Sequence, residues 1–144
     1  MARQKDRQGK KSVSFRFDPI TVRRLKDRAA DADAGQTALA ERYIEEGLRQ
    51  DEHPLIYFRE GAAGRRPALL GSRLDVAEAI ATIRQNDGSI EEAAAYLEIP
   101  IEQLEAAARY YGEYTEEVDE LIERSRTAGE RERERWRRGR EAIA

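Results

Sequence analysis

The stretch KKSVSFRFDPITVRRL, at residues 10–25, changes its hydrophobic period from two to between three and four within a few positions. Its apolar side chains alternate with polar ones at Val13, Phe15 and Phe17. Such alternation is typical of a strand with one buried face. Asp18 and Pro19 then provide a favoured N-cap and a favoured first helical residue. The spacing therefore predicts a strand over residues 11–18 that leads directly into a helix.

A second helix is predicted after the turn DADAG and ends near residue 50. One strand and two helices in about forty residues bury too little apolar surface to fold alone. A single strand also leaves a row of backbone N–H and C=O groups unpaired. Two copies that pair their strands and pack their helices together solve both problems, so an obligate homodimer is expected. Its predicted core consists of Val13, Phe15, Phe17, Leu25, Leu39, Tyr43 and Ile44.

Residues 11–50 resemble the ribbon-helix-helix family of DNA-binding proteins in the stretches SVSFRF, DPITVRRLKDRA and AGQTALAERYIEEGLR. In that family, strands from two subunits form an antiparallel ribbon that enters the major groove. The resemblance implies that the outward strand residues contact bases, and these are Ser12, Ser14 and Arg16. It implies phosphate binding by the strand and by the start of the second helix, at Lys11, Gly35, Gln36 and Thr37.

The charge of the N-terminal region favours a nucleic-acid partner. Residues 1–28 contain 10 basic and 3 acidic residues, a net charge of +7, and phosphate contacts need such a surplus. Residues 1–10 are predicted to be a disordered basic arm. The alternative for this region is an edge strand with a solvated outer face, in an adapter that dimerises without binding DNA.

Residues 53–124 are predicted to form a second, acidic domain. Residues 51–122 contain 6 basic and 16 acidic residues, a net charge of −10. We expect a hairpin from about Ile56 to Leu70, followed by helices capped at Asp75, Ser89 and Thr115. Two of these helices join through Glu98-Ile99-Pro100, as in a helix-turn-helix.

This region resembles the small winged-helix-like domain of unknown function found in some bacterial antitoxins. The resemblance rests on HPLIYFREGAAGRRPALLGSRLDV, EEAAAYLEIP and ARYYGEYTEEVDELIE. The helix in the place of a recognition helix carries Glu102 and Glu105, which repel phosphates, so a structural or protein-binding role is favoured. The arginines near the hairpin either contact phosphate or offset the acidic helices, and they are Arg59, Arg65, Arg66 and Arg73.

Residues 125–144 are predicted to be a helical or disordered charged tail. A tryptophan is unusual in a solvated segment and is typical of an anchor for a partner. The alternative is that Trp136 packs on its own domain. By resemblance to antitoxins, the tail is expected to bind a toxin, and the expected toxin is a PIN-like RNase with a magnesium-binding carboxylate cluster. The expected toxin-binding residues are Arg133, Arg135, Trp136, Arg137, Arg138 and Ile143.

The composition argues against catalysis and against a membrane span. The chain has no cysteine and one histidine, His53, which lies in the predicted linker. No catalytic constellation, transition-metal site or cofactor site is expected. No apolar run approaches the roughly 18 residues of a membrane helix, and the basic N-terminus lacks the apolar region of a signal peptide. A cytoplasmic protein is therefore expected.

Together these features predict a mainly α protein with two folded domains. An N-terminal ribbon-helix-helix dimer would precede a winged-helix-like domain and a charged tail. The predicted function is that of a type II antitoxin, which represses its own operon through operator DNA and neutralises its toxin. Higher-order assembly would follow if one toxin oligomer bridges two dimers. The alternatives are a free-standing repressor with a sensory or second DNA-binding domain, and the adapter that never binds DNA.

Overall fold

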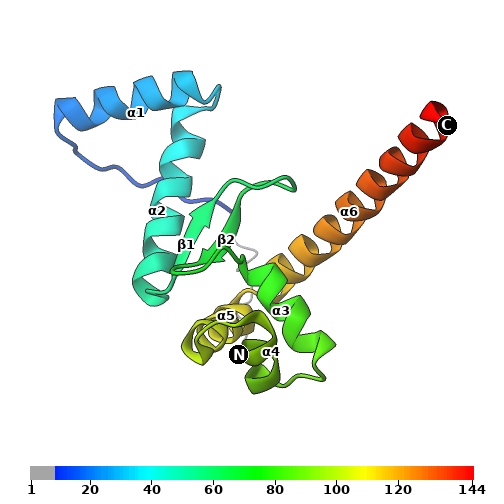
Figure 1. The fold of residues 1–144 in the computed structure, drawn as a ribbon. Coiled ribbons are helices and arrows are strands. Elements are labelled where there is room, and N and C mark those ends of the chain that lie inside the picture. Colours follow the sequence, from blue (N-terminus) through cyan, green and yellow to red (C-terminus); the bar gives the residue numbers. More distant parts are fainter. Residues whose placement is uncertain (1–8) are drawn as a thin grey trace. The chain divides into compact units, whose positions relative to one another are not determined.

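The computed structural model describes residues 9–144, which form six helices and one two-stranded antiparallel sheet (Figure 1). Most of the predicted basic arm, residues 1–8, lies outside the described residues. The elements are α1 (Pro19–Asp31), α2 (Gln36–Glu52), β1 (Ile56–Arg59), β2 (Arg66–Leu69), α3 (Val76–Gln85), α4 (Ile90–Leu97), α5 (Ile101–Glu113) and α6 (Thr115–Ile143). They separate into two compact units between Glu52 and His53.

The predicted fold class is wrong at its N-terminal end. Residues 9–18, the leading segment, contain no strand, and the first regular element is α1. The order is helix, helix, hairpin and helices, rather than a strand followed by two helices. A strand is held by hydrogen bonds to a neighbouring strand, and no described segment of this chain pairs with residues 9–18. The local alternation is present in the sequence without the pairing that would make it a strand.

The N-terminal unit consists of the leading segment and two helices. Pro19 opens α1 after Asp18, as predicted, although the Asp18 side chain makes no capping hydrogen bond. The helix ends in a Schellman motif, because the Ala34 N–H donates to the Ala29 carbonyl at 2.9 Å. Asp33 takes the left-handed conformation that this motif requires, with φ 49°. The turn then leads into α2.

The predicted hairpin is confirmed and opens the second unit. Strands β1 and β2 pair antiparallel, with Ile56 opposite Leu69 and Arg59 opposite Arg66. Gly61 and Gly64 close the loop by exchanging two backbone hydrogen bonds of 3.0 Å. Gly64 has φ +106°, a conformation that residues with a Cβ rarely adopt.

The core of the second unit lies between the hairpin, α3, α4, α5 and the first turns of α6. Its fully buried side chains come from all these elements, and the largest are Tyr110, Ile56, Leu69, Leu104, Val76 and Val118. The C-terminal part of α6 extends away from this core (Figure 1). Because one continuous helix spans residues 115–143, the charged tail is an extension of the last core helix.

In the second unit, two of the three predicted helix caps are confirmed. Asp75 accepts from the Glu78 N–H at 2.8 Å, and Glu78 accepts from the Asp75 N–H, which together make a capping box. Ser89 accepts from the Glu92 N–H at 3.1 Å. Thr115 does not cap α6, because its hydroxyl donates to the Tyr111 carbonyl at 2.7 Å.

The interpretation of His53 as a linker residue is wrong. Its side chain is only 7% exposed and belongs to the core of the second unit. The imidazole makes an edge contact with Tyr110, at 5.2 Å between ring centroids. Its Nε2 lies 3.4 Å from the Glu113 carboxylate. The histidine therefore fixes the start of the second unit against α5.

Within residues 9–144, no helix combines the length and the apolar character needed to cross a membrane.

Candidate nucleic-acid and partner-binding surfaces

The leading segment exposes both its polar and its apolar side chains. Ser12, Ser14 and Arg16, the predicted base-contacting residues, are exposed, and so is Lys11. The apolar side chains are also exposed, at 68% for Val13, 62% for Phe15 and 58% for Phe17. The rings of Phe15 and Phe17 lie 6.0 Å apart between centroids, so these two residues gather on one side.

Few of the apolar side chains on α1 and α2 are buried. Among residues 9–52, only Ala29 and Leu39 are buried. Leu25 is half-buried, whereas Tyr43 and Ile44 remain 44% and 49% exposed. Two further residues that the prediction of the dimer core missed, Ile20 and Leu48, are exposed as well. The N-terminal unit thus carries an uncovered apolar surface, formed by Val13, Phe15, Phe17, Ile20, Tyr43, Ile44 and Leu48.

Three of the four predicted phosphate-binding residues lie at the start of α2, and the fourth, Lys11, lies in the leading segment. Gly35 precedes the helix, Gln36 and Thr37 are its first residues, and all three are exposed. The first N–H groups of a helix have no intrahelical acceptor, so they are available to an anion. Lys10 precedes Lys11 in the leading segment and forms an ion pair of 3.0 Å with Glu41 of α2.

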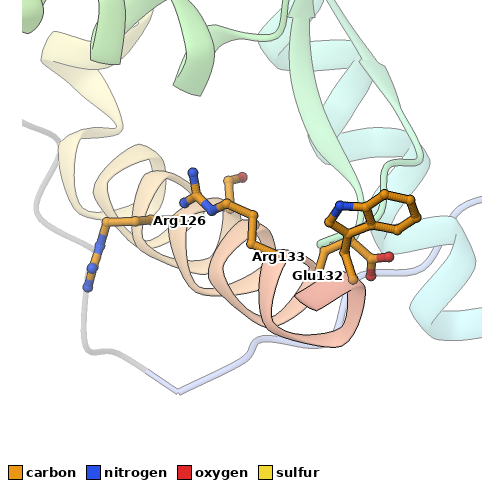
Figure 2. A pocket seen from close by; sticks show the side chains of 6 residues that line it. Arg126, Glu132 and Arg133 are labelled. Atoms are coloured by element: carbon orange, nitrogen blue, oxygen red, sulfur yellow. The ribbon is translucent and has the colours of Figure 1, made fainter. Parts of the chain in front are cut away.

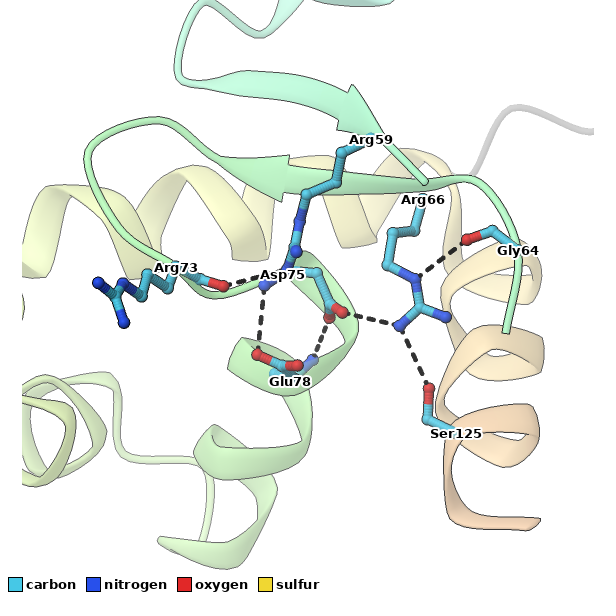
Figure 3. A network of polar contacts seen from close by, with 7 residues as sticks. All are labelled: Arg59, Gly64, Arg66, Arg73, Asp75, Glu78 and Ser125. Atoms are coloured by element: carbon cyan, nitrogen blue, oxygen red, sulfur yellow. Dashed lines mark hydrogen bonds and ion pairs between the residues drawn. The ribbon is translucent and has the colours of Figure 1, made fainter. Parts of the chain in front are cut away.

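Three of the four arginines near the hairpin are held by protein groups, and Figure 3 shows this for Arg59 and Arg66. Arg66 is buried, and its Nη1 lies 2.9 Å from the Asp75 carboxylate and 3.5 Å from the Ser125 hydroxyl. Its Nε donates to the Gly64 carbonyl at 3.3 Å. A Cβ at Gly61 would lie 2.6 Å from this Nε, so any other residue there would force the buried Arg66 side chain to shift. Arg66 therefore joins the hairpin, α3 and α6, and phosphate cannot reach it.

Arg59 and Arg65 also have structural partners, whereas the Arg73 side chain is exposed. Arg59 donates to the Arg73 carbonyl at 3.0 Å, and Arg65 pairs with Glu60 at 3.3 Å. On α5, the exposed residues include Glu102, Glu105 and Arg109. The contacts of Arg59, Arg65 and Arg66 assign these three arginines mainly to the internal structure of the second unit.

The base of α6 is held by a polar cluster that sequence reasoning missed. Asp119 accepts from Arg84 at 2.7 Å and from the Tyr111 hydroxyl at 3.0 Å, and Arg84 also contacts that hydroxyl. Loss of hydration, together with the hydrogen bond to Asp119, raises the pKa of Tyr111. The cluster connects α3, α5 and α6, so the first part of α6 is fixed to the core.

The second part of α6 is solvated along its length. From Ala128 onward every residue is exposed except Glu134, which is half-buried. Trp136 is 69% exposed and Ile143 is 89% exposed, so the alternative that Trp136 packs on its own domain is wrong. Ion pairs three or four residues apart support this exposed helix, as between Arg137 and Glu141 at 2.6 Å.

The tail arginines differ in their partners. Arg135, Arg137 and Arg138 each pair with a glutamate of α6, at distances of 3.7, 2.5 and 3.1 Å. Arg133 has no ion pair with any residue of the described chain, and the same holds for Arg140, which sequence reasoning missed. The described residues that line a shallow, open hollow beside Trp136 (Figure 2) all belong to α6, and they are Ser125, Arg126, Gly129, Glu132, Arg133 and Trp136.

No protein-family model matches this chain, and neither the curated proteins nor the solved structures compared with it contain a match.

Proposed function

We propose that this chain is a cytoplasmic antitoxin that acts as a homodimer, represses its own operon through operator DNA, and neutralises a PIN-like RNase toxin. The observation that carries the proposal is the uncovered apolar surface of the N-terminal unit, which adjoins exposed serine and arginine side chains of the leading segment. Such a unit needs a partner to fold stably and offers polar groups suited to DNA.

The need for a second copy follows from the burial in the N-terminal unit. Seven large apolar side chains there are at least 44% exposed, from Tyr43 at 44% to Ile20 at 73%. Large exposed apolar areas on a soluble protein commonly mark an interaction site. A second copy supplies a surface of the same composition, and a two-fold axis makes such a surface self-complementary. The dimer proposed here buries these side chains and does not rely on a strand in the leading segment.

The polar side chains of the leading segment support DNA as a ligand. Arg16 can donate two hydrogen bonds to guanine, and the hydroxyls of Ser12 and Ser14 can donate or accept at base edges. The net charge of +7 over residues 1–28 supplies the phosphate attraction that most protein–DNA complexes need. A dimer would present two copies of these groups, which fits a palindromic operator.

The exposed half of α6 supports a protein partner. An exposed helix with a tryptophan on one side fits the helix-in-groove mode of recognition. The arginines of the tail complement a carboxylate cluster such as a PIN-like active site. We therefore assign toxin neutralisation to the region from Glu130 onward.

Co-expression with the product of the adjacent reading frame tests the antitoxin role. We expect that product to arrest growth alone, to be harmless with the full chain, and to co-purify with it. A chain truncated before Glu130 should remain dimeric but fail to neutralise. Full neutralisation by the truncated chain would overturn the assignment of the tail, and a benign neighbour would leave a free-standing repressor.

Operator binding is tested with the DNA upstream of the chain's own coding sequence at moderate salt. Replacing Arg16 by alanine should weaken binding by about 1–3 kcal/mol and relax base preference at one position per half-site. Arg124→Ala, which removes the same charge from an exposed residue of α6, is the matched control. Equal binding by the Arg16 variant would support the adapter that never reads DNA.

A further inference from the structure

Two rows of side chains run along the exposed half of α6. Residues seven apart on a helix point in nearly the same direction. One row consists of Gly129, Trp136 and Ile143, and it continues from Ile122, which packs against the core. The other consists of Arg126, Arg133 and Arg140. Because Arg133 and Arg140 stand three residues before and four residues after Trp136, they lie beside it on one side of the helix.

Glycine in the apolar row has no internal explanation. Gly129 lies in the interior of α6, where glycine costs about 1 kcal/mol relative to alanine. A Cβ there would meet nothing within 4 Å, and the same is true at Gly139. The described chain therefore does not require these glycines. Their effect is to leave open space along the helix, and the hollow beside Trp136 includes Gly129 (Figure 2).

The arginines decide what kind of molecule fits this side of the helix. A second α6 would bring one arginine row against another, and like charges at that distance repel. Nucleic acid would require many free cations, whereas Arg126, Arg135, Arg137 and Arg138 are already paired with glutamates. Arg131, Arg133 and Arg140 have no such pair among residues 9–144. Arg131 lies on the opposite side of α6, whereas Arg133 and Arg140 lie beside Trp136. They favour a partner that supplies carboxylates next to an apolar groove.

We propose that the side of α6 formed by Gly129, Arg133, Trp136, Arg140 and Ile143 docks in an apolar groove of a partner protein whose rim carries carboxylates. Trp136 fills the groove, and the partner backbone approaches closely over Gly129. Arg133 and Arg140 are separated by about 10 Å along the helix, at roughly 1.5 Å per residue, so they require two acidic groups at that spacing. The identity of the partner as the toxin rests on the proposed function, whereas the docking side rests on α6 alone.

The test compares two double substitutions in the full-length chain, with the purified product of the adjacent reading frame as the probe. Arg133→Glu with Arg140→Glu reverses the two charges beside Trp136. Arg124→Glu with Arg131→Glu makes the same charge change at the same spacing on the opposite side of α6, at residues that are not among the expected toxin contacts. We expect the first pair to weaken binding at least about 100-fold and the second less than about fivefold, measured by titration calorimetry.

Two single substitutions separate docking from helix stability. Trp136→Ala should weaken binding at least about 30-fold, as for a central anchor residue. Gly129→Leu favours the helix but fills the space for the partner backbone, so it should weaken binding at least about tenfold while the helical circular dichroism is kept or increased. A docking side elsewhere on α6 would leave both affinities unchanged.

The outcomes distinguish this inference from the proposed function. Tight binding of the wild-type chain that survives both Trp136→Ala and the Arg133/Arg140 pair overturns the docking side and leaves the antitoxin role intact. Equal losses of affinity from the two double substitutions also overturn the docking side, because a change in the overall charge of α6 would then explain the result. No binding of the wild-type chain removes the antitoxin role together with this partner. If the Arg133/Arg140 pair weakens binding to a 30-base-pair upstream duplex instead, the side binds nucleic acid and the inference fails.

Discussion

The Nη1 atom of Arg66 lies 2.9 Å from Oδ2 of Asp75, and both side chains are buried (Figure 3). The other carboxylate oxygen of Asp75 accepts the Glu78 N–H and so caps α3. One carboxylate thus neutralises a buried guanidinium and starts a helix. Because Arg66 also reaches the Ser125 hydroxyl at 3.5 Å, this pair links the hairpin to the helix that carries the proposed partner-binding surface.

Removing the Asp75 carboxylate should strongly destabilise the second unit. Asp75→Ala leaves the Arg66 charge buried without its counter-ion and also removes a helix cap, which together cost about 3–5 kcal/mol. Urea unfolding measures this change. The double variant Arg66→Met with Asp75→Ala should recover part of the loss, because no unpaired charge remains. The explanation would be contradicted if the double variant lost as much stability as Asp75→Ala and Arg66→Met lose in sum.

The pH dependence of stability should show the environment of Glu78. Loss of hydration raises the pKa of Glu78 above its ordinary value of 4.5, and the negative charge of Asp75 raises it further. The folded chain then binds more protons than the unfolded chain between these two pKa values, so this contribution to stability is present at low pH. It is lost as the pH rises from about 4.5 through the raised pKa.

Glu78→Gln tests this dependence by urea unfolding between pH 4 and pH 8. The variant should lose less stability than the wild type as the pH rises, because glutamine does not ionise and can still accept from the Asp75 N–H. Glu102→Gln, the same change at an exposed residue of α5, is the control. Identical pH profiles for wild type and Glu78→Gln would contradict the prediction.

The turn between α4 and α5 should be stabilised by glycine. Glu98 has φ 56° and ends α4 in the left-handed conformation, while the Ile99 N–H donates to the Ala94 carbonyl at 3.2 Å. Glycine adopts this conformation without steric cost and removes a negative charge from a helix C-terminus. Glu98→Gly should therefore raise the free energy of unfolding by about 1 kcal/mol. Glu98→Ala keeps the Cβ and should raise the free energy of unfolding by less than Glu98→Gly does. An equal increase from both variants would show that the effect comes from the lost charge.

The uncovered apolar surface of the N-terminal unit should control the oligomeric state. Phe15→Ser removes an aromatic ring that is 62% exposed in one chain, so it should weaken the homodimer at least about tenfold, measured by sedimentation velocity. Tyr96→Ser removes a 74% exposed ring from the second unit and should leave the dimer unchanged. A wild-type chain that sediments as a monomer at high concentration would exclude the dimer itself.

Local features of the fold could be predicted because their causes lie within a few residues. Pro19 after Asp18 determines the start of α1, and Asp75 with Glu78 determines the start of α3. The hairpin followed from two short apolar runs around a glycine-rich loop. The strand at residues 11–18 was predicted wrongly for a related reason: its alternation is local, but its hydrogen bonds must come from another strand.

The sequence by itself determined which segments become helices, where the hairpin lies and where the charges are concentrated along the chain. Only the tertiary structure decided that His53 is buried against Tyr110, that Arg66 serves Asp75 rather than phosphate, and that Trp136 stays 69% exposed instead of packing on its own domain. The reason is physical. Helix periods, caps and turns depend on neighbours in sequence, whereas burial and ion pairing depend on which distant side chains the packed core brings together.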